Sequence, residues 1–67
     1  MSLAKVIEVL AEGKSVEEAL ENAVKQASKT VHSIKSVYLQ ETQGIVENNK
    51  VVRYRVNAKI TFVLDEQ

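Results

Sequence analysis

The sequence predicts an α+β domain in the order strand, helix, strand, strand, with one helix packed on one face of a three-stranded sheet. Three observations predict this fold. Residues 51–64 alternate between apolar and polar side chains, residues 15–33 carry an apolar stripe at helical spacing, and Asn48-Asn49 separates two runs of β type. A helix with one apolar stripe must bury it against another element, and the apolar row of the last strand is its natural partner.

The first predicted strand spans Ala4 to Glu12, a stretch rich in Val, Ile and Leu that stops at Gly13. Both of its faces carry apolar side chains: Val6 and Leu10 on one, and Ile7, Val9 and Ala11 on the other. A strand with one face in water alternates between apolar and polar residues. We therefore expect this strand to be covered on both faces, or to meet another subunit on one of them.

The predicted helix begins at Ser15 and runs to about Ser33. Its apolar residues recur at steps of three and four: Val16, Ala19, Leu20, Ala23, Val24, Ala27 and Val31. Ser15 and Glu18 have the spacing of a capping box, in which each side chain satisfies a free backbone N–H. Acidic residues lie near the start and basic residues near the end, which complements the helix dipole. We interpret His32 as a charge at the end of this helix rather than as a ligand.

The second predicted strand, Ile34 to Glu47, is joined to the last by a turn at Asn48-Asn49, because Asn tolerates the left-handed conformation of a tight turn. A two-residue loop places Glu47 opposite Lys50, Thr42 opposite Arg55 and Ser36 opposite Thr61. A bulge near Gly44 would shift part of this pairing by one residue. The face away from the helix is then mostly polar: Ser36, Tyr38, Gln40, Thr42, Arg53, Arg55, Asn57 and Lys59.

The chain has 67 residues, so we expect a single domain over 1–67, in which Met1 to Leu3 could be an expression remnant. Small domains usually need disulfides, a metal or self-association. The sequence has no Cys and one His, which excludes a disulfide and an ordinary zinc cluster. Self-association remains, and it also suits the two apolar faces of the first strand and the long sheet edges.

The charge pattern narrows the classes of partner. Nine basic and nine acidic residues give zero formal charge, whereas nucleic-acid binders carry a basic excess. No apolar stretch approaches the roughly 20 residues needed to span a membrane, and no signal peptide is recognised. We expect a cytoplasmic protein with no nucleic-acid or membrane partner. With one His and no Cys, no catalytic pair is found, and we do not expect an enzyme.

Three segments together resemble the dodecin family. They are "SVEEALENAVKQASKTV", the E-x-x-G segment from Glu41 to Gly44, and the Y-x-V-x-x-x-x-x-F-x-L-(D/E) pattern from Tyr54 to Asp65. The resemblance covers about Ala4 to Glu66. It implies an antiparallel three-stranded sheet partly wrapped around its helix, and a hollow homododecamer. It also implies a flavin store or buffer that binds FMN, FAD or riboflavin in pairs at subunit interfaces.

The residues at the flavin positions differ from the family pattern. The stacking tryptophan aligns with Ser36, or with Val37 if the alignment slips by one, and the ring-binding glutamine aligns with Arg55. The basic residue that reaches a flavin phosphate aligns with Gln43. The chain contains no Trp, and Arg donates hydrogen bonds but cannot accept them. The resemblance therefore predicts a small-ligand storage shell in which flavin binding is weak or absent.

Two interpretations of Arg55 stay open at this stage. It lines an anion pocket at a subunit interface, or it forms an inter-subunit ion pair with Glu41, Glu47 or Asp65. The chain resembles a branch of the family without the tryptophan that is associated with calcium. A calcium- or anion-binding shell is thus one alternative function, and flavin storage through a modified pocket is another. No EF-hand loop is present, so the sequence names no metal ligand.

Overall fold

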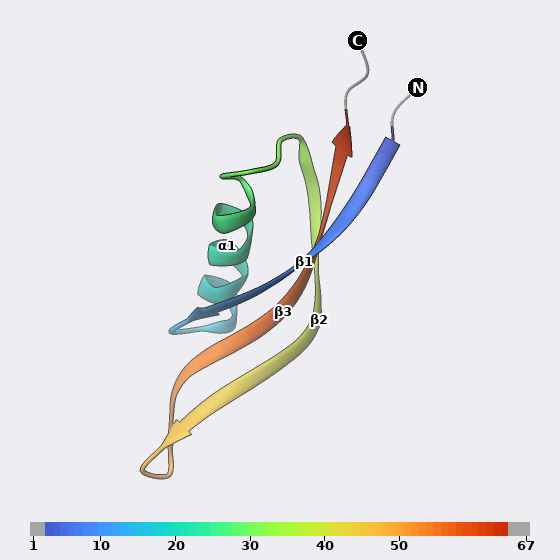
Figure 1. Cartoon of the computed structure of the whole chain (residues 1–67). Coiled ribbons are helices and arrows are strands. Elements are labelled where there is room, and N and C mark those ends of the chain that lie inside the picture. The colour runs from blue at the N-terminus through green and yellow to red at the C-terminus, as the bar shows by residue number, and fades with distance from the viewer. Residues whose placement is uncertain (1–2, 65–67) are drawn as a thin grey trace.

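The computed structural model of the chain describes residues 3–64, which form four elements in the predicted order. Strand β1 spans Leu3–Gly13, helix α1 Val16–Ala27, strand β2 Ile34–Glu47 and strand β3 Lys50–Leu64. The sheet order is β1-β3-β2, and β3 pairs antiparallel with both neighbours. The helix lies against one face of the curved sheet (Figure 1), so the predicted β-α-β-β fold is confirmed.

The core lies between α1 and the apolar row of β3. This row buries Val56, Ala58, Ile60 and Phe62, and the helix buries Ala19, Ala23 and Ala27. The helix contributes only alanines to the fully buried layer, which allows its backbone to approach the sheet closely. Ile7, Val9 and Ala11 of β1 pack against the same core. The predicted helix stripe and the predicted inner face of β3 are therefore confirmed in the middle of the sheet.

The β2–β3 hairpin extends beyond the helix. The molecule measures 53 × 19 × 13 Å, and the hairpin forms one end of its long axis (Figure 1). No helix covers this end, so Val46, Val51 and Val52 are 59%, 52% and 43% exposed. Val52 was expected in the buried row of β3, and it is exposed because α1 begins further along the sheet.

The start of α1 follows the sequence prediction, whereas its end does not. The Ser15 hydroxyl accepts a hydrogen bond from Glu18 N–H at 3.0 Å, and the Glu18 carboxylate accepts from Lys14 N–H. The helix ends at Ala27 rather than near Ser33. The hydroxyls of Ser28 and Thr30 bond to carbonyls of the last turn, a local alternative to continued helix.

This earlier helix end changes the environment of two residues. His32 lies in the connection to β2 and is exposed, so it is not a charge at the end of the helix. Ser33, next to it, has a φ of 59°, a left-handed conformation that no helical residue adopts. Val31 still packs against the core, but it does so from this connection.

The hairpin turn is confirmed, and the pairing beyond it is partly corrected. Asn48 and Asn49 have φ values of 52° and 64°, and Glu47 pairs with Lys50. An irregularity between Ile45 and Val46 then shifts the register by one residue. As a result Thr42 faces Val56, and not Arg55 as expected, while Gln43 faces Arg55.

A second shift restores the predicted pairing. It lies between Leu39 and Glu41, where Gln40 is the extra residue of β2. Beyond it Ser36 pairs with Thr61, as predicted. Between the two shifts Glu41 and Gln43 therefore take the places on the outer face that were expected for Gln40 and Thr42.

Candidate functional site

The sheet face opposite the helix, here called the open face, has no element of the described chain over it (Figure 1). Paired residues of adjacent strands share a face. In the middle of the open face, Asn57 of β3 lies between Leu10 of β1 and Glu41 of β2. In the next row, Arg55 lies between Glu12 and Gln43. These two rows place five polar or charged side chains next to one another.

A hollow of 470 Å³ lies over these rows. It is lined by Leu10, Glu41, Thr42, Gln43, Arg55 and Asn57, so all three strands contribute to it. Leu10 is 68% exposed and forms an apolar wall, whereas the other lining side chains are polar or charged. The hollow has the mixed lining that small-molecule sites commonly show.

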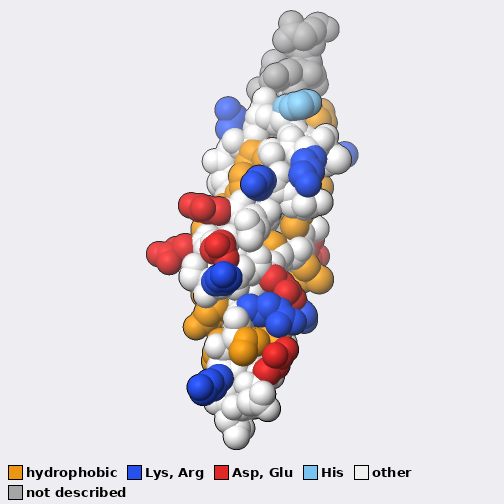
Figure 2. Space-filling view, turned by 90° about the vertical axis from the view of Figure 1, so that its left-hand side faces the viewer, with side chains coloured by type: hydrophobic (Ala, Val, Ile, Leu, Met, Phe, Trp, Pro, Cys, Tyr) orange, Lys and Arg blue, Asp and Glu red, His pale blue; other side chains and the backbone are white. Residues whose placement is uncertain are grey.

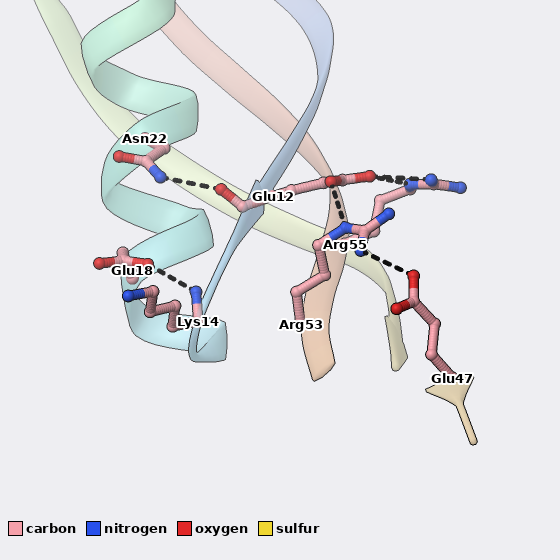
Figure 3. A network of polar contacts seen from close by, with 7 residues as sticks. All are labelled: Glu12, Lys14, Glu18, Asn22, Glu47, Arg53 and Arg55. Atoms are coloured by element: carbon pink, nitrogen blue, oxygen red, sulfur yellow. Dashed lines mark hydrogen bonds and ion pairs between the residues drawn. The ribbon is translucent and has the colours of Figure 1, made fainter. Parts of the chain in front are cut away.

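Glu12 joins the two arginines of β3 beside this hollow. Its Oε1 lies 2.8 Å from Arg53 Nε, and its Oε2 lies 2.8 Å from both Nε and Nη2 of Arg55. A second acid, Glu47, approaches Arg53 Nη1 at 3.6 Å. Figure 3 shows both guanidinium groups converging on the Glu12 carboxylate, with Glu47 on the far side of Arg53. Each carboxylate oxygen of Glu12 thus holds one arginine.

These contacts change the protonation of Glu12. The hydrogen bond from Arg55, followed by that from Arg53, holds the pKa of the Glu12 carboxyl below its ordinary value of 4.5, against the opposing effect of desolvation. The same carboxylate raises the pKa of Arg53. All three side chains remain 37–41% exposed, so solvent and salt screen these charges. Glu12 is ionised at neutral pH and neutralises part of the arginine charge.

The position of Glu12 is determined by its backbone. Its carbonyl accepts a hydrogen bond from Asn22 Nδ2 of the helix at 2.8 Å (Figure 3). The next residue, Gly13, leaves no room for a side chain, since an added Cβ would lie 2.6 Å from Ala19 N. The end of β1 is therefore held tightly against the start of α1, and this contact positions the Glu12 carboxylate over β3.

Asn57 contributes an unusual polar atom to the hollow. Its Oδ1 is buried and has no hydrogen-bond partner in the described part of the chain. Buried polar atoms of native proteins are nearly always paired, so an unpaired acceptor requires an explanation. Asn57 lines the hollow, and a turn of its side chain would bring this acceptor within reach of a ligand there.

The structure brings together two of the four residues predicted from the resemblance. Gln43 and Arg55 are cross-strand partners that line the same hollow. Ser36 is exposed on the open face, but it pairs with Thr61, about 20 Å from Arg55 along the strand. Val37 packs against the core beneath the helix. A single chain therefore does not place Ser36 beside Arg55.

Within the chain Arg55 pairs with Glu12, a partner not considered in the sequence. The expected ion pair of Arg55 with Glu41, Glu47 or Asp65 of another subunit stays a prediction. Asp65 lies outside the described residues. Leu10 and Asn57 were likewise not foreseen as site residues. Alternation in β1 places Glu12 on the same face as Leu10, but no hairpin joins β1 to β3, so nothing in the sequence fixes their register.

The side of the molecule that carries the helix has both signs of charge. Figure 2 shows basic side chains towards the upper end and again in the lower half, and acidic ones mainly around the middle. Among residues 3–64 no group of three or more His, Cys, Asp or Glu is arranged to hold a metal ion. Over the same residues, no helix is long and apolar enough to cross a membrane.

Comparisons with solved structures support the fold independently. A Thermus thermophilus protein superposes with a TM-score of 0.91 at 24% identity, with all of both chains covered. Dodecin from Streptomyces davaonensis gives 0.90 at 24% identity over 97% of each chain. Dodecin from Streptomyces coelicolor gives 0.89 at 28% identity over 98% of this chain and 96% of its own. A search of curated proteins finds no match.

A family comparison extends the likeness from the fold to the sequence. The model of the dodecin family matches residues 3–65, nearly the whole chain. The match includes both rows of the candidate site, from Leu10 in β1 to Asn57 in β3. The length, the element order and the strand pairing agree with it as well. The chain belongs to the dodecin family, whose members are non-catalytic binding proteins.

Proposed function

We propose that the chain is one subunit of a homododecameric dodecin shell, which stores or sequesters a small ligand and binds flavin weakly or not at all. The ligand site is the hollow on the open face, completed by neighbouring subunits. Gln43 and Arg55 belong to this site, and Ser36 reaches it only from another subunit. The protein acts by binding, as its family does, and catalyses no reaction.

The observation that carries the flavin part of the proposal is the pairing of Arg55 with Glu12. By resemblance, the family's glutamine binds the pyrimidine edge of the flavin ring at this position. Here Nε and Nη2 of Arg55 both lie 2.8 Å from Glu12 Oε2. A flavin carbonyl would have to displace this carboxylate, and Arg55 has no acceptor for the ring N–H.

The stacking half of the family's site is also changed. Ser36 is exposed on the open face and has no ring to stack on an isoalloxazine. Tyr38, two residues further along β2, is 66% exposed and is the one aromatic side chain that the described open face carries. Without both the ring and the matched amide, the usual flavin sandwich loses its two main attractive contacts.

The exposed apolar surface supports assembly. Eight large apolar side chains of the described residues are substantially exposed: Leu3, Val6, Leu10, Tyr38, Val46, Val51, Val52 and Leu64. Within residues 3–64, strands β1 and β2 also leave both edges of the sheet unpaired. A chain of this size is marginally stable alone, and contact between subunits would cover the parts of these surfaces that lie outside the hollow.

Native mass spectrometry tests assembly and ligand content together. We expect the mass of twelve subunits, each of 7.5 kDa, with no flavin retained. Added riboflavin or FMN should keep its fluorescence at micromolar protein. A monomeric mass would contradict the assembly, and strong quenching by the unaltered protein would contradict the proposed loss of flavin binding.

A gain of flavin binding provides a sharper test. The double variant Ser36→Trp/Arg55→Gln restores the aromatic ring and the amide. Because stacking on an aromatic side chain is worth about 1–3 kcal/mol, flavin should bind about fivefold to 150-fold tighter than to the unaltered protein. The control Gln40→Trp/Arg55→Gln places the ring at another exposed position of β2 and should not restore binding.

A further inference from the structure

The lining of the hollow contains an arginine, but the charge that is left there without an ion-pair partner among the described residues is negative. Arg53 and Arg55 are balanced by Glu12 and Glu47, with which they form ion pairs. Glu41 lines the hollow and forms no ion pair within residues 3–64. The uncompensated charge of the lining is therefore negative, although it contains an arginine.

The hydrogen-bonding capacity of the hollow has the same bias. The buried Oδ1 of Asn57 is an acceptor without a donor. The Glu41 carboxylate, opposite Asn57 in the register, offers only acceptors when it is ionised. Two of the donor nitrogens of Arg55 are already bonded to Glu12. The Gln43 amide also offers donors, but the unpaired acceptor and the uncompensated carboxylate both favour a ligand that donates hydrogen bonds.

The apolar wall adds a third requirement. Leu10 flanks Asn57 on the side opposite Glu41, so an apolar surface lies across the same row from the carboxylate. The volume of 470 Å³ suits a small organic molecule rather than a bare metal ion. A matching ligand has a donating, positively charged end and an apolar body.

We propose that the hollow binds a small organic amine in its protonated form. The ammonium group donates to the Glu41 carboxylate, a turn of the Asn57 side chain offers Oδ1 as a second acceptor, and the apolar body lies on Leu10. Glu12 acts as the residue that determines specificity, because it neutralises Arg55 and so removes the attraction for anions. This inference rests on the proposed function in that it takes the hollow as the ligand site of the assembled shell.

Three probes of nearly the same shape test the assignment: benzylamine, benzyl alcohol and benzoate. Their binding to the assembled protein is measured by saturation-transfer NMR titration at neutral pH and low salt. We expect benzylamine to bind about fivefold tighter than benzyl alcohol, since partly exposed charge pairs contribute up to about that factor. Benzoate should bind most weakly of the three.

Two variants assign the preference to particular residues. Glu41→Gln should remove the advantage of benzylamine over benzyl alcohol. Glu12→Gln frees Arg55 and should raise the affinity for benzoate about fivefold. The matched control is Glu8→Gln, which removes one negative charge from the open face two residues from Leu10, outside the hollow. It should leave the order of the three probes unchanged.

The outcomes separate this inference from the proposed function. Equal binding of the three probes, a preference for benzoate, or an effect of Glu8→Gln as large as that of Glu41→Gln would overturn the amine assignment. Absence of binding by all three probes would also overturn it, because the hollow would then hold no amine. Native mass spectra of the same samples report the twelve-subunit shell independently, so an intact shell without amine binding refutes this inference alone.

Discussion

The two faces of the sheet are built from alternate residues of the same strands, but their side chains differ in burial and in hydrogen bonding. On the helix face, Val56, Ala58 and Ile60 are fully buried against the alanines of α1. On the open face, Arg55 and Asn57 are only half-buried. Arg55 is bonded to Glu12, whereas Oδ1 of Asn57 has no hydrogen-bond partner among the described residues. The side chains of the helix face are fully packed within a single chain, whereas those of the open face are left partly exposed and partly unpaired.

This difference indicates where function can reside. A close-packed layer of small and branched side chains leaves no room for a ligand and tolerates few changes. The open face retains a hollow, an unpaired acceptor and exposed apolar residues, because no element of the described chain covers it. The fold thus uses the helix face for stability and leaves the open face for partners and ligands.

The largest expected effect comes from two neighbouring residues of β3 that point to opposite faces. Ile60→Ala should lower the free energy of unfolding by about 3 kcal/mol, because Ile60 is completely buried and its truncation leaves a cavity. Thr61→Ala, on the open face, should cost less than about 1 kcal/mol. Chemical denaturation followed by circular dichroism measures both. Equal losses would mean that the open face is packed as tightly as the helix face.

A smaller loss of stability is expected from substituting a glycine. Gly13 lies at the end of the sheet that the helix covers, and Gly44 lies at the uncovered end. Gly13→Ala should destabilise the fold by about 1–3 kcal/mol, because the added Cβ would lie 2.6 Å from Ala19 N and 2.9 Å from the Glu18 carbonyl carbon. Gly44→Ala would meet only the Val51 side chain, with Cγ1 at 3.4 Å and Cγ2 at 3.7 Å, and should be tolerated. Thermal unfolding compares the two, and a Gly44 variant as unstable as the Gly13 variant would contradict this account.

The smallest expected effect depends on pH and concerns the charges of the open face. Since folding lowers the pKa of Glu12, its ion pairs stabilise the fold above the unfolded pKa of about 4.5, and this contribution is lost as the pH falls through the lower folded value. The Tm of Glu12→Gln should therefore lie below that of the unaltered protein at pH 7, and this difference should disappear in acid.

Salt and a second variant control this measurement. High salt at pH 7 should also shrink the difference, because the three side chains are partly exposed. Glu21→Gln, which removes an exposed acid of the helix, should change the Tm less than Glu12→Gln does at pH 7. A Glu12→Gln difference that persisted in strong acid would show that Glu12 acts through packing instead of charge.

Local chemistry in the sequence was sufficient to predict the four elements and the faces of α1 and β3. The Ser15 cap, the alanine-rich stripe of α1 and the alternation of β3 each depend on neighbours within a few residues, and all three are found as expected. The turn at Asn48-Asn49 is also local, because it depends on the left-handed conformation that Asn tolerates. The end of the helix was missed, since the hydroxyls of Ser28 and Thr30 compete with further helical turns.

The site depended on information that only the tertiary structure supplies. A one-residue shift moves a side chain to the opposite face, and the shift between Ile45 and Val46 places Gln43 beside Arg55. Glu12 reaches Arg55 from 43 positions away in the chain, through a pairing of β1 with β3 that no turn specifies. The sequence by itself thus determined which residues of β1 and β3 face outward. Strand register, which is set by packing of the whole sheet, decided which residues of β2 join them on the open face and which side chains meet.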